Sequence, residues 1–240
     1  MLDMGNDHMP IDACKEQMKA IASCLLQLGT HNLRHLHIET FTKFDNRFLP
    51  DPWCPAPLKL RKLHIQDSPM PRIPSWMGSL IHLEHLSLVV KGLEHEDLCL
   101  LGCLPSLLHL SLSRHYRSGQ EALYKDKLVI CGYHGFPCLK RFYISGQNPM
   151  FSMGSMPKLE LLSIELNASK IEILTNGGFD IGIGNLPCLT AIKCIIYYNG
   201  KCVHEEVEVA KAALERAVST HPNHPSLELR LPVSFSSKIP

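Results

Sequence analysis

A six-residue unit of the form apolar-x-x-apolar-x-apolar recurs along almost the whole chain and constrains its fold more than any other feature. The seven clear copies start at Leu33, Leu60, Leu83, Leu107, Leu139, Leu159 and Leu189, and a degenerate copy, SLELRL, ends at Leu231. Successive clear copies start 27, 23, 24, 32, 20 and 30 residues apart. Repetition at this spacing is typical of solenoids, in which each repeat is one supersecondary unit.

The second and third apolar residues of each unit are two positions apart, so they lie on the same face of a β-strand. Leu63 and Ile65 form one such pair, and Leu86 and Leu88 form another. The leucine that opens each unit lies just before the strand and can turn into the same core. One unit cannot bury its apolar face alone, so neighbouring repeats must stack as parallel strands joined by crossovers. We therefore predict an α/β repeat solenoid, an irregular horseshoe with a parallel concave sheet.

Other stretches predict the elements between and around these strands. Residues 13–28 are predicted to form a lead-in helix, and the proline-rich residues 45–58 an extended loop anchored by Trp53. An insertion over 114–126 precedes a strand candidate at 128–132, and residues 145–157 are predicted to be a loop. The predicted organisation is an N-terminal segment over 1–31, repeats over 32–202, a cap over 203–232 and a tail over 233–240.

The predicted cap consists of a helix and the last strand. Residues 204–219 carry an apolar stripe that includes Val207, Ala210 and Leu214, and Glu208 can pair with Lys211 across one turn. The prolines of HPNHP then end the helix before the final strand. An exposed end of a repeat array needs a polar cover, which is the role we expect for this block. A partner-binding amphipathic helix is the alternative.

Motifs for chemistry are missing from the sequence. It contains no GxxxxGK[ST] phosphate loop, no HExxH pair, no GxSxG elbow and no C-x-x-C pair among its ten cysteines. The histidines show no ligand spacing that indicates a metal site, so we expect no cofactor and no enzymatic activity. A formal net charge of +1 argues against a nucleic-acid partner. We expect no membrane span and a cytoplasmic location, with the nucleus also possible, because no secretory signal or long apolar run is present.

Outward positions of the strands offer the remaining candidate site. They form two columns on the concave face that are rich in basic or titratable groups. The candidate protein-binding residues are His35, His37, Lys62, His64, His85, His109, Arg141, Tyr143 and Lys193. Such a surface can recognise an acidic patch of another protein by charge complementarity. A solvated strand face or an intramolecular docking surface explains the same pattern.

The repeats and the terminal block resemble the C-terminal leucine-rich-repeat region of plant intracellular nucleotide-binding leucine-rich-repeat immune receptors, especially the grass type. The resemblance covers about residues 12–232. The residues that carry it are IPSWMGSLIHLEHLSL (73–88), LLGCLPSLLHLSL (100–112), GFPCLKRFYI (135–144), SMPKLELLSIEL (155–166), GNLPCLTAIKCII (184–196) and EEVEVAKAALERAVSTHPNHPSLELRL (205–231). The terminal block is the most specific of these.

The resemblance implies a recognition module for innate immunity, which binds a pathogen effector, a guarded host protein or the receptor's own signalling domains. In such receptors a nucleotide-binding segment precedes the repeats, so we expect this chain to be a fragment that lacks it. A substrate adaptor of a ubiquitin ligase, which also uses leucine-rich repeats, is the alternative hypothesis. A hydrolase based on cysteine and histidine is a third, but no fixed arrangement of those residues supports it.

Overall fold

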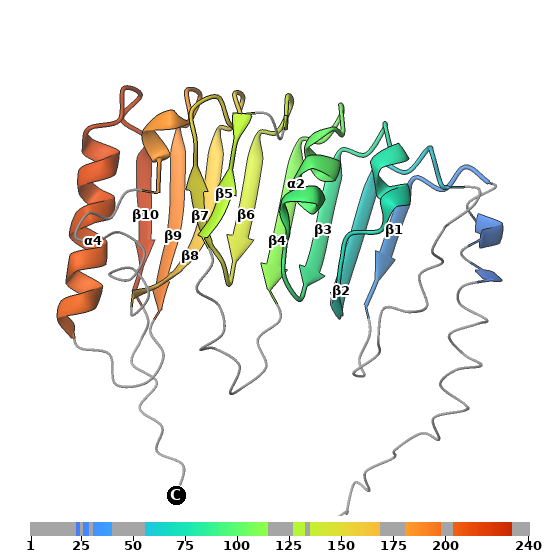
Figure 1. The fold of residues 1–240 in the computed structure, drawn as a ribbon, viewed down its shortest axis with the longest axis horizontal. Coiled ribbons are helices and arrows are strands. Elements are labelled where there is room, and N and C mark those ends of the chain that lie inside the picture. The colour runs from blue at the N-terminus through green and yellow to red at the C-terminus, as the bar shows by residue number, and fades with distance from the viewer. Residues whose placement is uncertain are drawn as a thin grey trace, which may run out of the picture.

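Eight strands form one parallel sheet in the computed structural model, which describes residues 23–24, 26–28, 31–39, 56–114, 127–132, 135–168, 181–197 and 204–231. The order β1-β2-β3-β4-β6-β8-β9-β10 follows the chain from one end of the molecule to the other (Figure 1). The strands are β1 His35–Ile38, β2 Lys62–Met70, β3 His85–Val90, β4 His109–Arg114, β6 Arg141–Ser145, β8 Leu161–Asn167, β9 Ala191–Tyr197 and β10 Ser226–Arg230. Each coincides with one copy of the repeat unit, which confirms the predicted solenoid.

The pairing register aligns the repeat units position by position. Between β3 and β4, for example, Leu86 lies opposite Leu110 and Leu88 opposite Leu112. Both inward positions of β2, β3, β4, β6, β8 and β9 are at most 2% exposed, and so are the opening leucines from Leu60 to Leu189. The apolar residues of the repeat therefore form one continuous core, as their spacing predicts.

Before each of β1, β2, β3, β4, β6 and β8, one backbone carbonyl accepts hydrogen bonds from two consecutive amides of the next repeat. The carbonyl oxygen of Arg34 lies 2.7 Å from the amide of Arg61 and 3.0 Å from that of Lys62. The same double acceptance recurs at the carbonyls of Arg61, Glu84, Leu108, Lys140 and Glu160. It pins the start of every strand to its neighbour, so the register does not slip from repeat to repeat.

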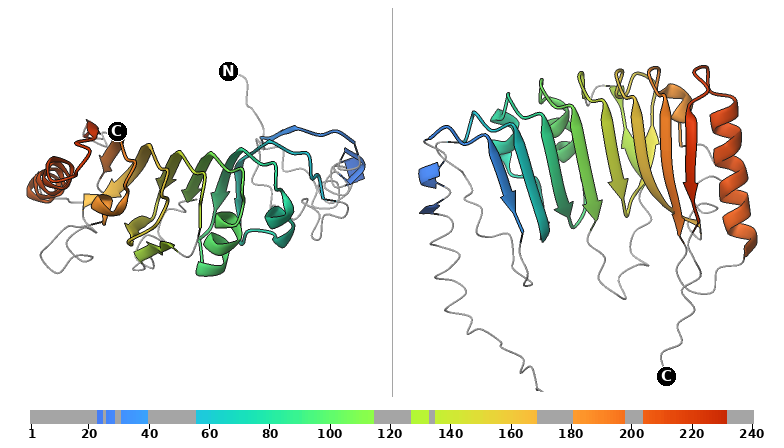
Figure 2. Two further views of the ribbon diagram at one scale, coloured as in Figure 1. Left: turned by 90° about the horizontal axis from the view of Figure 1, so that it is seen from above. Right: turned by 180° about the vertical axis from the view of Figure 1, so that it is seen from behind.

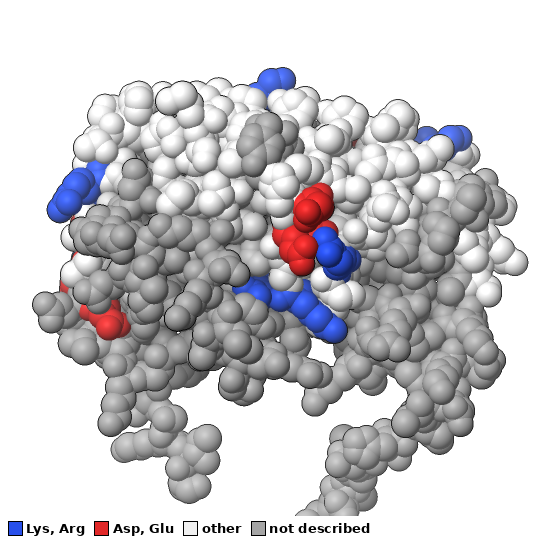
Figure 3. All heavy atoms as spheres, in the orientation of Figure 1, with Lys and Arg blue, Asp and Glu red and all other residues white. Residues whose placement is uncertain are grey.

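The elements that return the chain lie on one side of the sheet and leave the other face open (Figure 2). They are the 3-10 helix η2 (Ser75–Ser79), the helix α2 (His95–Gly102), the strands β5 (Lys127–Ile130) and β7 (Asn148–Phe151), and the 3-10 helix η5 (Ile183–Asn185). Side chains from these elements close the core, including Met77, Leu101 and Ile130, each completely buried. On the described part of this face, most atoms visible in Figure 3 belong to uncharged residues, and acidic and basic groups lie side by side near the middle of the view.

A buried carboxylate fixes α2 to the preceding repeat. Asp97 is 4% exposed, and its Oδ1 accepts a hydrogen bond of 3.1 Å from the amide of Ile73. Its Oδ2 accepts one of 3.0 Å from the amide of Glu94, which completes a capping box at the start of the helix. One oxygen thus satisfies the buried amide of Ile73, and the other satisfies an amide at the start of the helix.

The prediction that 145–157 is a loop is wrong in part, because β7 lies within it. β7 pairs in parallel with β5 as a separate two-stranded sheet, so the strand candidate at 128–132 is confirmed but lies outside the main sheet. Phe151 of β7 is 1% exposed and makes an edge-to-face contact with Phe142, with ring centroids 6.4 Å apart. β7 is four residues long and contains a proline, so its local sequence resembles that of a loop. It is a strand because it pairs with β5, which is distant in sequence.

The cap has the predicted helix and strand. The helix α4 (His204–Ser219) contacts β9, η5 and β10, with Val207, Ala210 and Leu214 buried, and Glu208 lies 3.8 Å from Lys211 as predicted. These contacts cover the core at the end of the array, which supports the capping role over partner binding.

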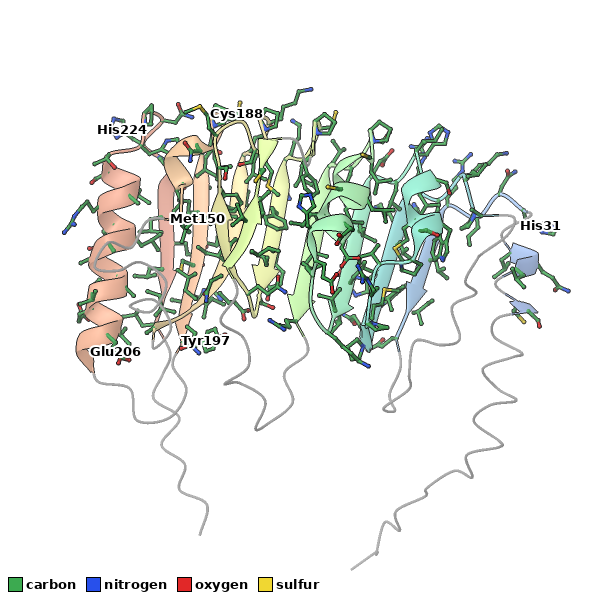
Figure 4. The ribbon with its side chains drawn as sticks, viewed as in Figure 1. His31, Met150, Cys188, Tyr197, Glu206 and His224 are labelled. Atoms are coloured by element: carbon green, nitrogen blue, oxygen red, sulfur yellow. The ribbon has the colours of Figure 1, made fainter. Side chains whose placement is uncertain are left out.

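The turn after α4 does more than end the helix. His221 is 2% exposed, and its Nε2 donates a hydrogen bond of 3.2 Å to the carbonyl oxygen of Leu186 while its Nδ1 accepts one from the amide of Asn223. The Asn223 side-chain amide donates one of 2.6 Å to the carbonyl oxygen of Pro187. The turn therefore fastens the cap to the last repeat, at the edge where Figure 4 shows Cys188 and His224.

Several sequence predictions lie outside the described residues. They are most of the lead-in helix over 13–28, of which 23–24 and 26–28 are described and helical, Trp53 with its loop, most of the insertion over 114–126, and the tail over 233–240.

Gly182 is a position where the backbone requires glycine. Its φ is +74°, and an added Cβ would lie 2.0 Å from the carbonyl oxygen of Phe151. The Phe151 amide donates to the carbonyl of Ile181, and the Asn185 side chain donates to the Phe151 carbonyl, so this loop is joined to β7 on both sides. The second sheet and the seventh repeat thus meet at this glycine.

We predict that Gly182→Ala lowers the free energy of unfolding by roughly 1–3 kcal/mol, because it combines a left-handed backbone with a clash against a backbone oxygen. Gly184→Ala is the matched control, since a Cβ there has no neighbour within 4 Å. Urea unfolding of both variants measures the difference. Equal stability of the two variants would contradict the prediction.

Candidate protein-binding face

The open face of the sheet carries two rows of outward side chains that run across the strands. The first row is His35, Lys62, His85, His109, Arg141, Leu161, Ala191 and Ser226, one from each strand in register. The second row, two residues further along each strand, is His37, His64, Ser87, Ser111, Tyr143, Ser163, Lys193 and Glu228. All nine predicted site residues lie in these two rows. The parallel register therefore brings together residues up to 158 positions apart (35 to 193).

The middle of the open face is hollowed into a groove of about 350 Å³ that spans β2 to β8. Six of the nine predicted residues line it: Lys62, His64, His85, His109, Arg141 and Tyr143. Among the described residues that line it, there is neither Asp nor Glu. His35 and His37 on β1 and Lys193 on β9 lie beyond the lining, so they flank the groove. The other eight lining residues were not among the predicted site residues: they are the buried Leu63, Leu86, Leu110 and Phe142 and the half-buried Ser87, Ser111, Leu161 and Ser163.

Histidines of adjacent strands pack against each other edge to face. The rings of His85 and His109 have centroids 4.2 Å apart, and those of His37 and His64 are 4.5 Å apart. A parallel, in-register sheet forces such contacts, because neighbouring strands lie about 4.8 Å apart. Two imidazolium ions at the separation of His85 and His109 would repel each other, so the packing of this pair favours the neutral rings.

The surroundings of His85 and His109 also favour the neutral form. Burial lowers the pKa of His85 below its ordinary value of 6.5, and the charge of Lys62 lowers it further, with Glu84 opposing. Burial likewise lowers the pKa of His109, and the positive charges of His85, Arg141 and Lys62 add to the effect. Both rings are therefore neutral at physiological pH.

Carboxylates beside the face are already engaged with other groups. Glu84 lies 3.0 Å from Arg61, and Glu160 lies 2.7 Å from Lys140. By contrast, neither Lys62 nor Arg141 takes part in an ion pair with any residue that the structure describes. The two cations at the sides of the groove thus keep their charge available to a ligand.

Tyr143 is held in position by a residue that the sequence did not suggest. Its hydroxyl donates a hydrogen bond of 2.7 Å to Oε1 of Glu165, and burial raises the pKa of the phenol above 10.0. Glu165 lies on β8 one outward position beyond Ser163, which is the register partner of Tyr143. Strand register, once known, identifies this pair, whereas the repeat unit alone does not, because Glu165 lies beyond the unit.

Lys193 lies at the far end of the second row and is engaged in a small charge network. Its Nζ is 3.3 Å from Glu228, which also lies 2.8 Å from Arg230. Hydrogen bonds from Arg230 and Lys193 lower the pKa of the Glu228 carboxyl. The charge of Lys193 is therefore partly neutralised within the chain, unlike that of Lys62.

Over the part of the chain that the structure describes, no three His, Cys, Asp or Glu residues come together in a way that could hold a metal ion.

The described cysteines are free thiols, and burial raises the pKa of Cys194 to about 12, so that thiol behaves as a small apolar core residue. Asn167, the first residue of an Asn-x-Ser sequon, is 4% exposed. No helix in the described ranges is both long and apolar enough to cross a membrane.

A stacked parallel sheet with a buried leucine ladder and an open polar face defines a repeat protein built for surface recognition. A family model described as a leucine-rich repeat region matches residues 8–227. The chain therefore belongs to the leucine-rich-repeat region family, and this family membership points to protein–protein recognition.

We predict that folding stability falls with pH below about 6.5 in part because of His85 and His109. Their lowered pKa values mean that the unfolded chain binds these protons more tightly than the folded chain. The stability that the neutral rings contribute is complete above the unfolded pKa and is lost as the pH falls through it toward the folded values.

The double variant His85→Gln/His109→Gln should accordingly lose less stability than the wild type between about pH 7.5 and pH 5. Thermal unfolding at a series of pH values measures this difference. The control is His95→Gln/His224→Gln, which also replaces two histidines. His95 lies in α2 and His224 in the turn after α4, and neither is among the groups that shift the pKa of His85 or His109. Parallel pH profiles of the wild type and the His85/His109 variant would refute the prediction.

Proposed function

We propose that this leucine-rich-repeat region is the protein-recognition part of a plant intracellular disease resistance receptor of the nucleotide-binding leucine-rich-repeat class. The observation that carries the recognition role is the open face, where in-register strands present basic and titratable side chains around a groove. The assignment to this receptor class rests on the resemblance of the repeats and, above all, of the terminal block over 205–231. The contacts of His221 and Asn223 give that block a structural purpose, since they fasten the cap to the last repeat.

The proposed role requires no catalysis and no cofactor. A pathogen effector, a guarded host protein or the receptor's own signalling domains would occupy the open face. Occupancy shifts a receptor from its resting to its active state only when the ligand binds the two states with different affinity. The free thiols among the described cysteines are consistent with the reducing interior of a cell.

Mapping the full transcript in the source plant tests the receptor class. An upstream phosphate loop of the GxxxxGK[ST] type supports the proposal, because that loop binds nucleotide in such receptors. An upstream ligase-binding helical motif would instead assign the chain to the ubiquitin-ligase adaptors and overturn it.

We predict that the open face, rather than the return face, binds the partner. The variant Lys62→Ser/Arg141→Ser removes the two unpaired cations of the groove and should weaken binding to a partner, identified by proximity labelling in the plant, by at least about tenfold. The binding constant is measured with the purified partner by calorimetry.

Lys158→Ser/Arg216→Ser is the matched control. It removes the same net charge from exposed positions at the edge of the array and on the cap helix. If both double variants bind the partner as the wild type does, the open face is not the binding surface. If both weaken binding equally, the effect is one of overall charge and the assignment to the groove is wrong.

A further inference from the structure

Positive charge in the groove has a regular spacing. Lys62 on β2 lies at one side of the groove and Arg141 on β6 lies next to its other side, and the packed rings of His85 and His109 lie on the two strands between them. With neighbouring strands about 4.8 Å apart, the two cations are anchored about 14 Å apart, and the middle of the histidine pair lies about 7 Å from each. The first row therefore offers three positions for negative charge at intervals of about 7 Å.

An extended peptide has a matching repeat. It rises about 3.3–3.4 Å per residue, and alternate side chains point the same way, so residues i, i+2 and i+4 present side chains about 6.7 Å apart on one face. A peptide that crosses the strands at a right angle would bring these three side chains over Lys62, the histidine pair and Arg141. On one face of a helix, side chains three or four residues apart lie about 4.5–6 Å apart along the axis, so three of them span about 10–12 Å and match the row of about 14 Å less well.

We propose that the groove binds an extended acidic segment of a partner protein, with carboxylates at three alternate positions lying over Lys62, the His85–His109 pair and Arg141. This inference rests on the proposed recognition function and names the chemistry of the partner. The charge complementarity is direct, because the groove lining contains two cations, no carboxylate and hydroxyl donors at Ser87 and Ser111.

The ends of the row limit the length of the acidic motif. After Arg141 the first row continues with Leu161 and Ala191, so no cation is available on β8 or β9 at this level. In the second row, Tyr143 is held by Glu165, and Lys193 is paired with Glu228. Three acidic positions thus match the groove, and a fourth beyond Arg141 would meet an apolar surface.

Binding of such a segment should be coupled to proton uptake. The groups that face the histidine pair are Lys62, Arg141 and His35, which disfavour a charged ring, and Glu84, which favours it for His85. A bound carboxylate adds a negative charge directly against the rings and raises the pKa of both histidines. Affinity must therefore increase as the pH falls from about 7.5 to 6, where the peptide carboxylates stay ionised.

Synthetic peptides and the full 240-residue chain test the inference by fluorescence anisotropy at about 0.15 M salt. The probe is a labelled peptide with the core Glu-Ser-Glu-Ser-Glu, and the control has the same composition with three consecutive glutamates. The alternating peptide should bind at least about fivefold more tightly, because the consecutive one can direct only two carboxylates to the same side. Equal affinities would overturn the proposal, since they indicate attraction by charge alone.

Variants of the chain locate the site and the proton linkage. Lys62→Ser/Arg141→Ser should abolish the preference for the alternating peptide, whereas Lys158→Ser/Arg216→Ser should retain it. The wild type should bind this peptide about threefold or more tightly at pH 6 than at pH 7.5, and His85→Gln/His109→Gln should lose that increase. Unchanged pH dependence in the histidine variant would overturn the role of the pair. Thermal unfolding confirms that each variant is folded.

A third peptide, in which phosphoserines replace the glutamates, separates two sources of negative charge. Tighter binding of the glutamate peptide supports the carboxylate motif, and clear preference for the phosphopeptide would replace it by a phosphorylated partner. The peptide experiments can also fail independently of the proposed recognition function. Peptide discrimination can fail while the plant partner still depends on Lys62 and Arg141, in which case the inference is wrong and the recognition role stands.

Discussion

A single backbone carbonyl before each strand from β1 to β8 of the main sheet, shared by two amides of the next repeat, sets the geometry on which the rest of the molecule depends. Because this acceptor recurs from Arg34 to Glu160, each strand begins at the same height as its neighbour. The intervals between repeats vary from 20 to 32 residues, yet the sheet keeps one register. On the described part of the return side, a 3-10 helix follows β2, an α-helix follows β3, and the strands β5 and β7 form a separate two-stranded sheet. The core therefore stays continuous although these return elements differ.

This register explains why so much of the fold and of the face could be predicted. The period of two within a strand assigns each residue of the unit to the core or to the open face, and parallel stacking then aligns equal positions. Leu86 and Leu110, or His85 and His109, thus become neighbours without any further information. The same reasoning placed all nine candidate residues in two rows. Whether those residues bind a partner is a separate question, which the sequence pattern leaves open.

The features that the sequence did not reveal depend on contacts outside the repeat unit. β7 is a strand because β5 pairs with it, and four residues that include a proline carry too little local signal. His221 and Asn223 lie in a segment whose prolines predict only the end of a helix. Their structural role depends on hydrogen bonds to the carbonyls of Leu186 and Pro187, which the sequence does not predict. Glu165 likewise gains its role from Tyr143 on the neighbouring strand. In each case the decisive partner lies 20 to 36 residues away.

Histidine suits this face for a reason that follows from the same register. Like charges directly opposite each other on neighbouring strands destabilise a sheet, so a row of lysines at these positions would oppose folding. The neutral imidazoles of His85 and His109 avoid this cost and pack edge to face with ring centroids 4.2 Å apart. Fixed cations are kept apart: Lys62 and Arg141 are separated by the His85–His109 pair. The arrangement lets an in-register sheet fold with few charges in contact. In the proposed complex with an acidic segment, the same two rings, His85 and His109, would gain a proton and attract the ligand, so one pair of side chains would serve both folding and recognition.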